Sequence, residues 1–334
     1  RGDFCFSAGG VAVIQSIIEV MILLTGGTGF IGRALARQLV EAGQRVRLLL
    51  RPSPRSPKLP TGVPVEVAVT SLADVRGLEA ALHGIRVVYH LAGEEGEGVR
   101  ANLQAVDVTG TRNLTRAAAE AGVERFFYIS HLGADRASAY PVLKAKGIAE
   151  EFVRKSGVPY TVLRGSMLFG LQDNFTTGIA KLMAAAPGFL PLPAGGKNLV
   201  QPLWVEDLVT CLLWALETPE TINHTYDIGG AEYFSFRRTV EIIMETIGKR
   251  RWLAPLPLPT LRTLTITLES LFPAFPFSTF WVDYLSYNRT CPVDSITRLF
   301  GFLPARFTYR LDHLRGIDWP RNARQAIFSK QAVK

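Results

Sequence analysis

Three glycines stand at a spacing that suits diphosphate binding. Gly26, Gly29 and Gly32 lie in the run LLTGGTGFIGRALARQL, between an apolar stretch and a segment with helical character. Where a strand turns into a helix, unpaired N–H groups and the positive end of the helix dipole face a bound anion. Gly26 could make the tight turn, Gly29 would let the phosphates approach, and Gly32 would let the helix pack on the strand. The spacing and its context predict a dinucleotide site; the alternative is a purely structural turn.

A cation follows the second apolar run. Arg51 ends the stretch VRLLLR, where the second strand of such a unit would lie beside the adenosine ribose. An acidic residue there binds both ribose hydroxyls of NAD, whereas an arginine offers a positive charge to the 2′-phosphate of NADP. Ser53, Arg55 and Arg33 could join this site. We therefore expect NADP(H) rather than NAD(H); in the alternative, Arg51 is a solvated charge and the cofactor is NAD.

Alternating strands and helices would position these residues. Apolar runs predict strands at 21–25, 45–50, 64–69, 86–91, 125–130 and 159–164, with helices near 31–42, 74–82, 102–121 and 143–156. This alternation is typical of βαβ units. The predicted fold class is therefore α/β, with a doubly wound parallel Rossmann sheet and a smaller C-terminal substrate lobe.

Changes in composition and in the regularity of the strand and helix patterns predict three segments of the chain. Residues 1–20 form an extension of unknown role, and residues 21–169 form the NAD(P)-binding Rossmann domain. Beyond Gly170, prolines and glycines break the regular pattern. We expect residues 170–334 to form a substrate or docking lobe that is interleaved with the sheet.

The run TGGTGFIG (25–32) resembles the TGxxGxxG turn of the extended and atypical short-chain dehydrogenases/reductases. Further segments resemble that family in the same order: VVYHLAG (87–93), VTGTRNL (108–114), RFFYISHLGA (125–134), PYTVLRGSMLFG (159–170) and QPLWVEDL (201–208). The tail NRTCPVDSITRLFGFLPARF (288–307) resembles the NmrA-like branch, which includes the nucleotide-binding accessory subunit of respiratory complex I. The resemblance covers about residues 21–315.

This resemblance implies a cofactor site at the carboxyl edge of the sheet. It would place these residues against the nucleotide: Thr25, Gly26, Thr28, Gly29, Phe30, Ile31, Gly32, Arg33, Arg51, Ser71, Leu91, Ala92, Gly93, Ser130 and Lys146. At Ser71 the chain departs from the acidic residue that the family often has near the adenine.

The family transfers hydride with a Tyr-x-x-x-Lys pair and a serine, and the resemblance leaves two registers open. The lysine lowers the pKa of the tyrosine, and residues four apart share a helix face. Ser130 takes the serine position, and Tyr140 with Lys144 has the formal spacing. In the other register Lys146 takes the lysine position and Val142 replaces the tyrosine. Tyr140 would then be a packing aromatic residue outside the helix.

Other residues bear on which chemistry the chain performs. Asp107 and Gly165 replace an Asn and a Pro that extended members often carry, which weakens a sugar-epimerase or dehydratase interpretation. His131 stands beside Ser130 and could face a substrate, whereas His90 lies in an apolar strand and is expected in the core. The remaining histidines and the cysteines have no metal-ligand spacing, so we expect neither a metal site nor a disulfide framework.

The positive charge is concentrated in the last third of the chain. Residues 237–334 contain 15 Lys and Arg against 7 Asp and Glu, a difference of +8 that equals the net charge of the whole chain. Such an excess favours an acidic partner surface, and a solvated basic face is the alternative. No recognition motif for nucleic acid accompanies it, so nucleic acid is not expected.

Residues 252–285 are rich in leucine and aromatic residues. They could line a pocket for an apolar small-molecule substrate, or form a docking surface for an anionic membrane or a membrane complex; ordinary core is the alternative. No uninterrupted apolar stretch reaches the length of a membrane-spanning helix. The three dispersed cysteines suit a reducing cytosol, so we expect a cytoplasmic protein, with membrane-peripheral contact as an open alternative. The sequence leaves the oligomeric state open.

Two functions agree with these features. One is an NADP(H)-dependent oxidoreductase of the short-chain type that acts on an apolar carbonyl, enone or quinone-type substrate. The other is a non-catalytic nucleotide-binding redox sensor, or an accessory subunit of a membrane respiratory complex.

Overall fold

The computed structural model describes residues 20–54, 59–185, 188–272 and 275–328. The extension at 1–19, with Cys5, and Arg55 in the predicted phosphate site lie outside the described residues.

A parallel sheet of seven strands runs through the described part of the N-terminal half and takes one strand from further along the chain. The strands are β1 (Met21–Thr25), β2 (Arg45–Leu50), β3 (Glu66–Val69), β4 (Val87–His90), β5 (Arg125–His131), β6 (Tyr160–Gly165) and β11 (His224–Ile228). Their order is β11-β6-β5-β4-β1-β2-β3, and every pairing is parallel. The strand order reverses between β1 and β4, which is where open α/β sheets bind ligands. The predicted fold class is confirmed.

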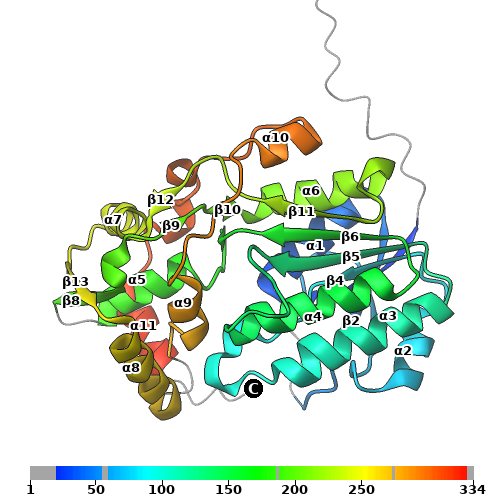
Figure 1. The fold of residues 1–334 in the computed structure, drawn as a ribbon, viewed down its shortest axis with the longest axis horizontal. Helices are drawn as coiled ribbons and strands as arrows, with labels where there is room; N and C mark the ends of the chain where they lie inside the picture. The colour runs from blue at the N-terminus through cyan, green and yellow to red at the C-terminus, as the bar shows by residue number, and fades with distance from the viewer. Residues whose placement is uncertain (1–19, 55–58, 186–187, 273–274, 329–334) are drawn as a thin grey trace, which may run out of the picture.

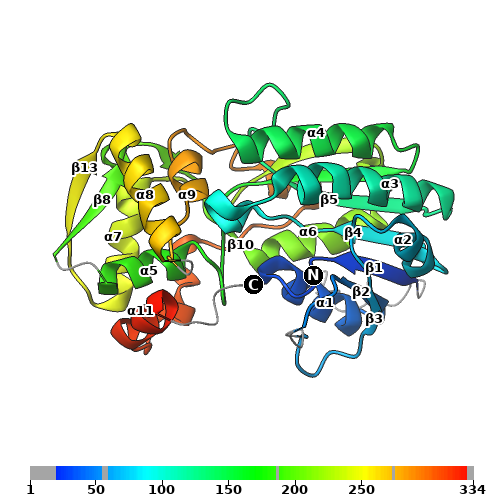
Figure 2. The same ribbon diagram turned by 90° about the horizontal axis from the view of Figure 1, so that it is seen from below.

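Helices cover both faces of this sheet (Figures 1 and 2). On one face α1 (Phe30–Glu41) packs against α6 (Val205–Glu217); on the other, α2 (Val75–Leu82), α3 (Thr111–Glu120) and α4 (Pro141–Lys155) lie side by side. Alternate residues of a strand point to opposite faces. Accordingly, Ile22 and Leu24 of β1 join the core beneath α1 and α6, whereas Leu23 joins the core beneath α2, α3 and α4.

A second lobe lies beyond the carboxyl ends of β5 and β6, toward which their arrowheads point in Figure 1. It contains α5 (Thr176–Ala185), α7 (Phe236–Ile247), α8 (Leu258–Leu271), α9 (Thr279–Tyr284), α11 (Trp319–Phe328) and the strand pair β8 (Phe189–Pro193) and β13 (Trp252–Leu256). The lobe has its own core, in which Ile179 and Met183 of α5 join Val240 and Ile243 of α7. Between these elements, α6 and β11 return to the sheet, so the two parts alternate along the chain.

Short pieces connect the sheet to the lobe. The strand pairs are β7 (Leu168–Phe169) with β10 (Leu203–Trp204), and β9 (Leu199–Val200) with β12 (Phe234–Ser235). The helix α10 (Ser295–Phe300) packs on α6 and β11.

The strands and helices predicted up to residue 164 are found with boundaries within two residues, with one exception. The expected helix 102–121 is a π-helical segment, Gln104–Gly110, followed by α3. A short 3₁₀ helix, η1 (Glu95–Arg100), follows β4 and was not predicted. Tyr140 is the N-cap of α4, outside the regular helix, and Pro141 begins that helix because a first-turn proline needs no N–H partner.

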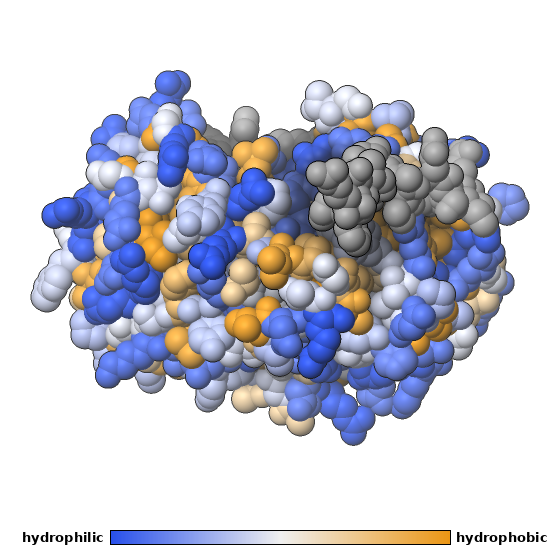
Figure 3. All heavy atoms as spheres, turned by 90° about the horizontal axis from the view of Figure 1, so that it is seen from above, coloured by the Kyte–Doolittle hydropathy of each residue, from blue (hydrophilic) through white to orange (hydrophobic). Residues whose placement is uncertain are grey.

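The apolar stretch 252–285 divides between core and surface. Leu253, Leu261, Phe277 and Phe280 are buried in the lobe, whereas Trp252 is 75% exposed. Figure 3 views the molecule from above Figure 1, on the side opposite α8, and its coloured part shows hydrophobic residues in small groups among hydrophilic ones. Among the described helices, none is long and apolar enough to cross a membrane. Much of the stretch therefore serves as core.

Candidate functional site

The glycine-rich turn joins β1 to α1 through backbone that admits no side chains at two positions. Gly26 has a φ of +69°, and a Cβ there would lie 2.8 Å from the Leu91 carbonyl group. A Cβ on Gly32 would overlap the backbone of Gly26 and Gly27. Gly29 is the N-cap of α1, its N–H donates to the Gly26 carbonyl at 2.9 Å, and it borders an open cavity. A side chain on Gly29 would occupy the space above the helix N-terminus.

A buried hydrogen-bond chain fixes the strand ends behind this turn. The Thr25 hydroxyl lies 2.7 Å from His90 Nδ1 and accepts the N–H groups of Leu91 and Ala92, each at 3.2 Å. His90 Nε2 lies 2.8 Å from Thr111 Oγ1, which donates to the Asp107 carbonyl. Burial, together with the nearby charge of Lys146, lowers the pKa of His90 to about 3. The hydrogen bonds of the Thr25 hydroxyl therefore hold the glycine-rich turn in place against the end of β4.

The predicted 2′-phosphate residues occupy the end of β2 and its surroundings. Arg51 is 63% exposed at the side chain, and its Nη1 lies 3.2 Å from Glu94 Oε1 on the loop after β4. The Arg33 guanidinium donates to the Thr28 carbonyl within the glycine-rich turn, so it braces that turn. The Ser71 hydroxyl accepts the Ala73 N–H at 3.2 Å and caps its own loop. Arg51 thus lies directly after the carboxyl end of β2, as predicted, and the Glu94 carboxylate lies beside it.

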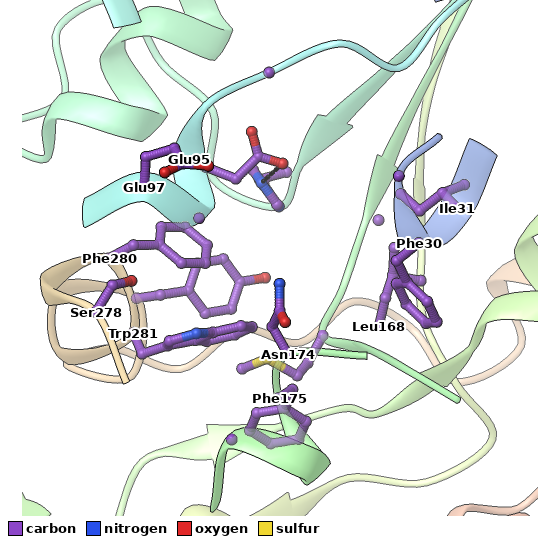
Figure 4. A pocket seen from close by; sticks show the side chains of 18 of the residues that line it. Phe30, Ile31, Glu95, Glu97, Leu168, Asn174, Phe175, Ser278, Phe280 and Trp281 are labelled. Carbon is purple, nitrogen blue, oxygen red and sulfur yellow. Dashed lines mark ion pairs between the residues drawn. The ribbon is translucent and has the colours of Figure 1, made fainter. Parts of the chain in front are cut away.

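A cavity of about 460 Å³ extends from the glycine-rich turn to the lobe. The sheet side is lined by Gly29, Phe30, Ile31, Leu91, Gly93, Glu95, Ser130, His131 and Lys146. The lobe side is lined by Asn174, Phe175, Lys181, Phe280, Trp281 and Tyr284. Figure 4 shows Phe30 and Ile31 facing Phe280 and Trp281 across this space. One continuous cavity thus joins the glycine-rich turn to an aromatic wall, which is made by Phe175, Phe280, Trp281 and Tyr284 on the lobe side.

Three charged side chains meet on the sheet side of the cavity. Lys146 is 3% exposed, and its Nζ lies 3.2 Å from Asp107 Oδ1 and 3.5 Å from Glu95 Oε2. Burial lowers the pKa of Lys146, but the Glu95 and Asp107 carboxylates outweigh it and raise this pKa well above the usual range. Burial raises the pKa of Asp107, against the opposing charge of Lys146. Burial by itself would raise the pKa of Glu95, but Lys146 and His131 outweigh it and hold this pKa below its usual range.

Two residues at the end of β5 reach the cavity. Ser130 is 1% exposed, and its Oγ has no hydrogen-bond partner among the described residues. His131 Nε2 lies 3.7 Å from Glu95 Oε1, and its ring packs at 5.6 Å from both Phe280 and Tyr284. A free hydroxyl and an imidazole therefore stand side by side, where a substrate oxygen could accept a hydrogen bond.

Tyr140 and Lys144 are not brought into this cavity. Tyr140 lines a neighbouring cavity of about 250 Å³ with Arg262 and Asp283, and its ring packs edge-on against Tyr287 at 5.4 Å. Burial, a hydrogen bond to Tyr287 and nearby charges raise the pKa of Tyr140 to about 12. Lys144 is exposed. Of the two registers, it is the second that brings its lysine, Lys146, beside Ser130; the catalytic role of Tyr140 and Lys144 stays a prediction.

Several lining residues were not found by sequence reasoning. Glu95 lies on the unpredicted 3₁₀ helix, and Asn174, Phe175 and Lys181 come from the start of the lobe, where no periodic pattern marked them. Phe280 and Trp281 were anticipated only as members of an apolar stretch. Within the described ranges, no group of three or more His, Cys, Asp or Glu is placed to hold a metal ion.

The residues present fit a dinucleotide. The turn at 26–32 offers bare backbone beside a helix N-terminus, in the way that suits a diphosphate. Gly93, Ser130 and Lys146 line the same cavity, and the charge of Lys146 is already paired with Asp107. This arrangement can hold a dinucleotide along the sheet edge, with the diphosphate at the glycine-rich turn and one end of the dinucleotide facing the lobe.

Comparison with known proteins agrees with this site. Residues 26–187 match a family model described as NAD(P)H-binding. The chain is 27% identical over 272 residues to the mitochondrial NADH dehydrogenase [ubiquinone] 1 alpha subcomplex subunit 9 of Arabidopsis thaliana, covering 79% of this chain and 67% of that one. It is 31% identical over 199 residues to a ceramide reductase of Caulobacter vibrioides, covering 60% of this chain and 62% of that one.

Solved structures share the fold over nearly the whole chain. The crystal structure of gox2253 superposes with a TM-score of 0.70 at 26% identity, covering 91% of this chain and 98% of that one. The triphenylmethane reductase of Citrobacter sp., complexed with NADP(H), has a TM-score of 0.70 at 19% identity, covering 88% and 99%. At that low identity the second likeness concerns the fold alone.

Proposed function

We propose a function from the premise that this chain contains an NAD(P)H-binding domain of the extended and atypical short-chain dehydrogenase/reductase superfamily. The function proposed is that of an NADP(H)-dependent oxidoreductase acting on an apolar carbonyl, enone or quinone-type substrate. The observation that carries this proposal is the single cavity that joins the glycine-rich turn to the aromatic wall of the lobe. Such a chamber lets one ligand lie on the sheet edge and a second face it from the lobe.

The glycine-rich turn, Gly93, Ser130 and Lys146 would hold the nucleotide. When bound there, a nicotinamide supplies or accepts a hydride at the carboxyl edge of the sheet. Arg51 favours NADP(H), because its guanidinium can pair with a 2′-phosphate. Glu94 already contacts Arg51 at 3.2 Å, so a 2′-phosphate would have to share that guanidinium or displace the carboxylate.

Ser130 and His131 would act on the substrate. The Ser130 hydroxyl, unpartnered in the described structure, can donate to a substrate oxygen on which negative charge develops. The His131 ring lies between Glu95 and the aromatic wall, so it can hold or move a proton at the same oxygen. Phe280 and Trp281 would exclude water from this point, which strengthens both interactions.

The experiment begins with the bound nucleotide. We would purify the protein, release the nucleotide and identify it, then measure NADPH oxidation with a panel of quinones and enones. Ser130→Ala should lower kcat/KM by about 100-fold without changing nucleotide affinity, since a donor used in the transition state is lost. Ser270→Ala, on the exposed face of α8, is the control and should have no effect.

Two outcomes would contradict the proposal at different levels. Release of NAD in place of NADP would show that the assignment of Arg51 is wrong, although the site itself would stand. NADPH that stays unoxidised across the panel would reject the oxidoreductase and favour the second function below.

The second candidate function is that of a nucleotide-binding accessory protein that contacts a membrane. An exposed patch at one end of the lobe favours it. Phe189 and Trp252 are paired by strand register and are 50% and 75% exposed, and the exposed Lys249 and Arg250 lie three and two residues before Trp252. Aromatic side chains beside basic ones suit the interface of an anionic bilayer. Similarity to a subunit of a mitochondrial NADH dehydrogenase supports the same idea.

A vesicle assay tests this second function. The protein should sediment with vesicles that contain phosphatidylserine and not with vesicles of phosphatidylcholine alone. The double variant Phe189→Ser with Trp252→Ser should lose most of that binding, whereas Tyr309→Ser, which removes an exposed aromatic elsewhere, should keep it. Equal binding by the double variant would reject this patch as the membrane contact.

A further inference from the structure

We propose that the cavity binds an amphiphilic anion: Lys181 pairs with a phosphate or carboxylate group, and the aromatic wall holds the apolar body. This inference rests on the proposed oxidoreductase function, because it names the class of substrate that the same cavity would take. It adds an anionic group to a substrate so far described only as apolar.

Lys181 is a cation placed against an apolar chamber. It lies on α5, whose buried face is made by Ile179, Ala180 and Met183 in the lobe core, and its side chain lines the cavity. Among the described residues, its amine has no carboxylate within ion-pairing distance. Burial lowers the pKa of Lys181, and the more distant Asp173 only partly opposes this. A half-buried cation without a partner is costly, unless a ligand supplies the missing charge.

Asp173, the acidic residue that precedes Lys181 on the same segment, already accepts hydrogen bonds from other groups. Asp173 accepts hydrogen bonds from the N–H groups of Gly170 and Thr177 at 3.0 and 2.9 Å, and from the Thr176 hydroxyl at 2.6 Å. His313 Nε2 lies 3.8 Å from the same carboxylate. Asp173 therefore holds the start of α5 in place and is not turned toward Lys181.

The wall beside Lys181 suits an apolar body. Phe175 and Trp281 lie 5.5 Å apart between ring centroids, and Phe280 and Trp281 lie 4.9 Å apart. Figure 4 shows these rings around the Asn174 side chain, whose amide can donate to an acceptor without adding charge. These aromatic rings, the Asn174 amide and the Lys181 side chain thus line the same cavity.

The opposite side of the cavity carries the other sign of charge. Glu95 and Glu97 of η1 line it, and the positive charge of Lys146 is already matched by Asp107 and Glu95. An anionic group would be repelled from this side and attracted to Lys181. A ligand oriented in this way keeps its anionic group at Lys181, and its uncharged part, with the reacting oxygen, extends along the aromatic wall toward Ser130 and His131. The electrostatics of the cavity would thus also set the orientation of the substrate.

Binding of three probes to the NADPH-loaded protein, measured by calorimetry, tests the proposal. Decyl phosphate, kept below its micelle concentration, should bind roughly 10- to 100-fold more tightly than 1-decanol, because only decyl phosphate carries the negative charge that can form an ion pair with the lysine. Inorganic phosphate should bind far more weakly than decyl phosphate. Lys181→Met should reduce the affinity for decyl phosphate to that for 1-decanol and leave 1-decanol unchanged. Lys197→Met, an exposed lysine of the same lobe, should behave as the parent protein.

Several results would overturn the inference. If decyl phosphate and 1-decanol bound equally tightly, the cavity would not recognise an anionic group. If inorganic phosphate bound as tightly as decyl phosphate, the cavity would not recognise an apolar body. An unchanged preference in Lys181→Met would show that another residue receives the anion. Weaker NADPH binding in Lys181→Met would assign the lysine to the nucleotide instead. None of these results affects turnover of uncharged quinones or enones, so failure here is distinguishable from failure of the proposed function.

Discussion

The two walls of the cavity each carry a lysine, and the two lysines are used differently. On the sheet side, Lys146 is buried between Asp107 and Glu95, with both carboxylates within 3.5 Å. On the lobe side, Lys181 is half-buried, and no carboxylate of the described residues pairs with it. A charge that is matched within the protein holds structure, whereas an unmatched one at a cavity is available to a ligand.

The largest effect should come from removing the matched charge. Lys146→Met would leave Asp107 and Glu95 buried without a cation, and we expect it to lower the free energy of unfolding by about 3–5 kcal/mol. Lys181→Met should leave stability unchanged or slightly higher, because it removes a desolvated charge. Urea denaturation at pH 7 measures both.

Lys155→Met serves as the surface control for this comparison. Lys155 pairs with Glu151 on the exposed face of α4, so its loss should cost less than about 1 kcal/mol. If Lys146→Met were no more destabilising than Lys155→Met, the distinction between the two walls would fail.

The second effect concerns the backbone that makes up part of the sheet-side wall. Gly29→Ile would place a branched side chain above the N-terminus of α1, and we expect nucleotide affinity to fall by about 100-fold or more. Gly188→Ile adds the same side chain where no atom lies within 4 Å, and it should bind nucleotide as the parent does. Titration with NADPH followed by fluorescence compares the two. Equal affinity in Gly29→Ile would reject the diphosphate site.

A smaller effect is expected from the lobe-side wall. Trp281→Leu should weaken binding of 1-decanol by about 10-fold, since an aromatic surface is lost, while NADPH affinity changes less than about twofold. Trp252→Leu, at the exposed end of the lobe, is the control and should change neither. Calorimetry with both ligands checks this separation. A parallel loss of NADPH binding would mean that the walls do not act independently.

Near pH 7 the smallest effect is the one that His90 contributes, because its ring is mostly neutral there in both the folded and the unfolded state. Its pKa is lowered from 6.5 to about 3 in the folded protein, because burial disfavours the charged ring. Between these values the unfolded state binds more protons, so His90 makes stability fall as the pH falls, by at most about 1.4 kcal/mol per pH unit. His90→Gln should flatten the stability profile over this window. His83→Gln, at an exposed position, should keep the slope of the parent protein.

The N-terminal half of the fold was predictable because its signals are local. The spacing of Gly26, Gly29 and Gly32 indicates a tight turn, in which neither Gly26 nor Gly32 has room for a side chain. This steric limit comes mainly from backbone close by, so it can be recognised in a short stretch of sequence. The strand and helix periods of 21–164 likewise depend on which face of each element is buried. The π-helical segment at 104–110 escaped prediction because its apolar residues also fit an ordinary helix.

The cavity could be predicted only in part. Ser130 and Lys146 were identified, because the resemblance places Ser130 near the end of a strand and Lys146 at the lysine position of the following helix. The sequence offered Lys144 as the catalytic lysine, with Lys146 two residues later as the alternative. Only the packing of α4 against the sheet turned Lys146 inward and left Lys144 exposed. Tyr140 had the right spacing, yet its position as N-cap aims it toward Tyr287 and α9.

By itself, then, the sequence determined that a nucleotide turn opens a parallel α/β sheet, since both properties follow from backbone geometry and from neighbours close along the chain. Only the tertiary structure decided which charges are matched and which face the cavity. Glu95, Lys146, Lys181 and Trp281 belong to four separate elements. Lys146 is paired because η1 and α4 meet at the sheet edge, whereas Lys181 lines the same cavity from the lobe and has no such partner among the described residues. Electrostatic pairing depends on distance in space, and spacing along the chain does not record it.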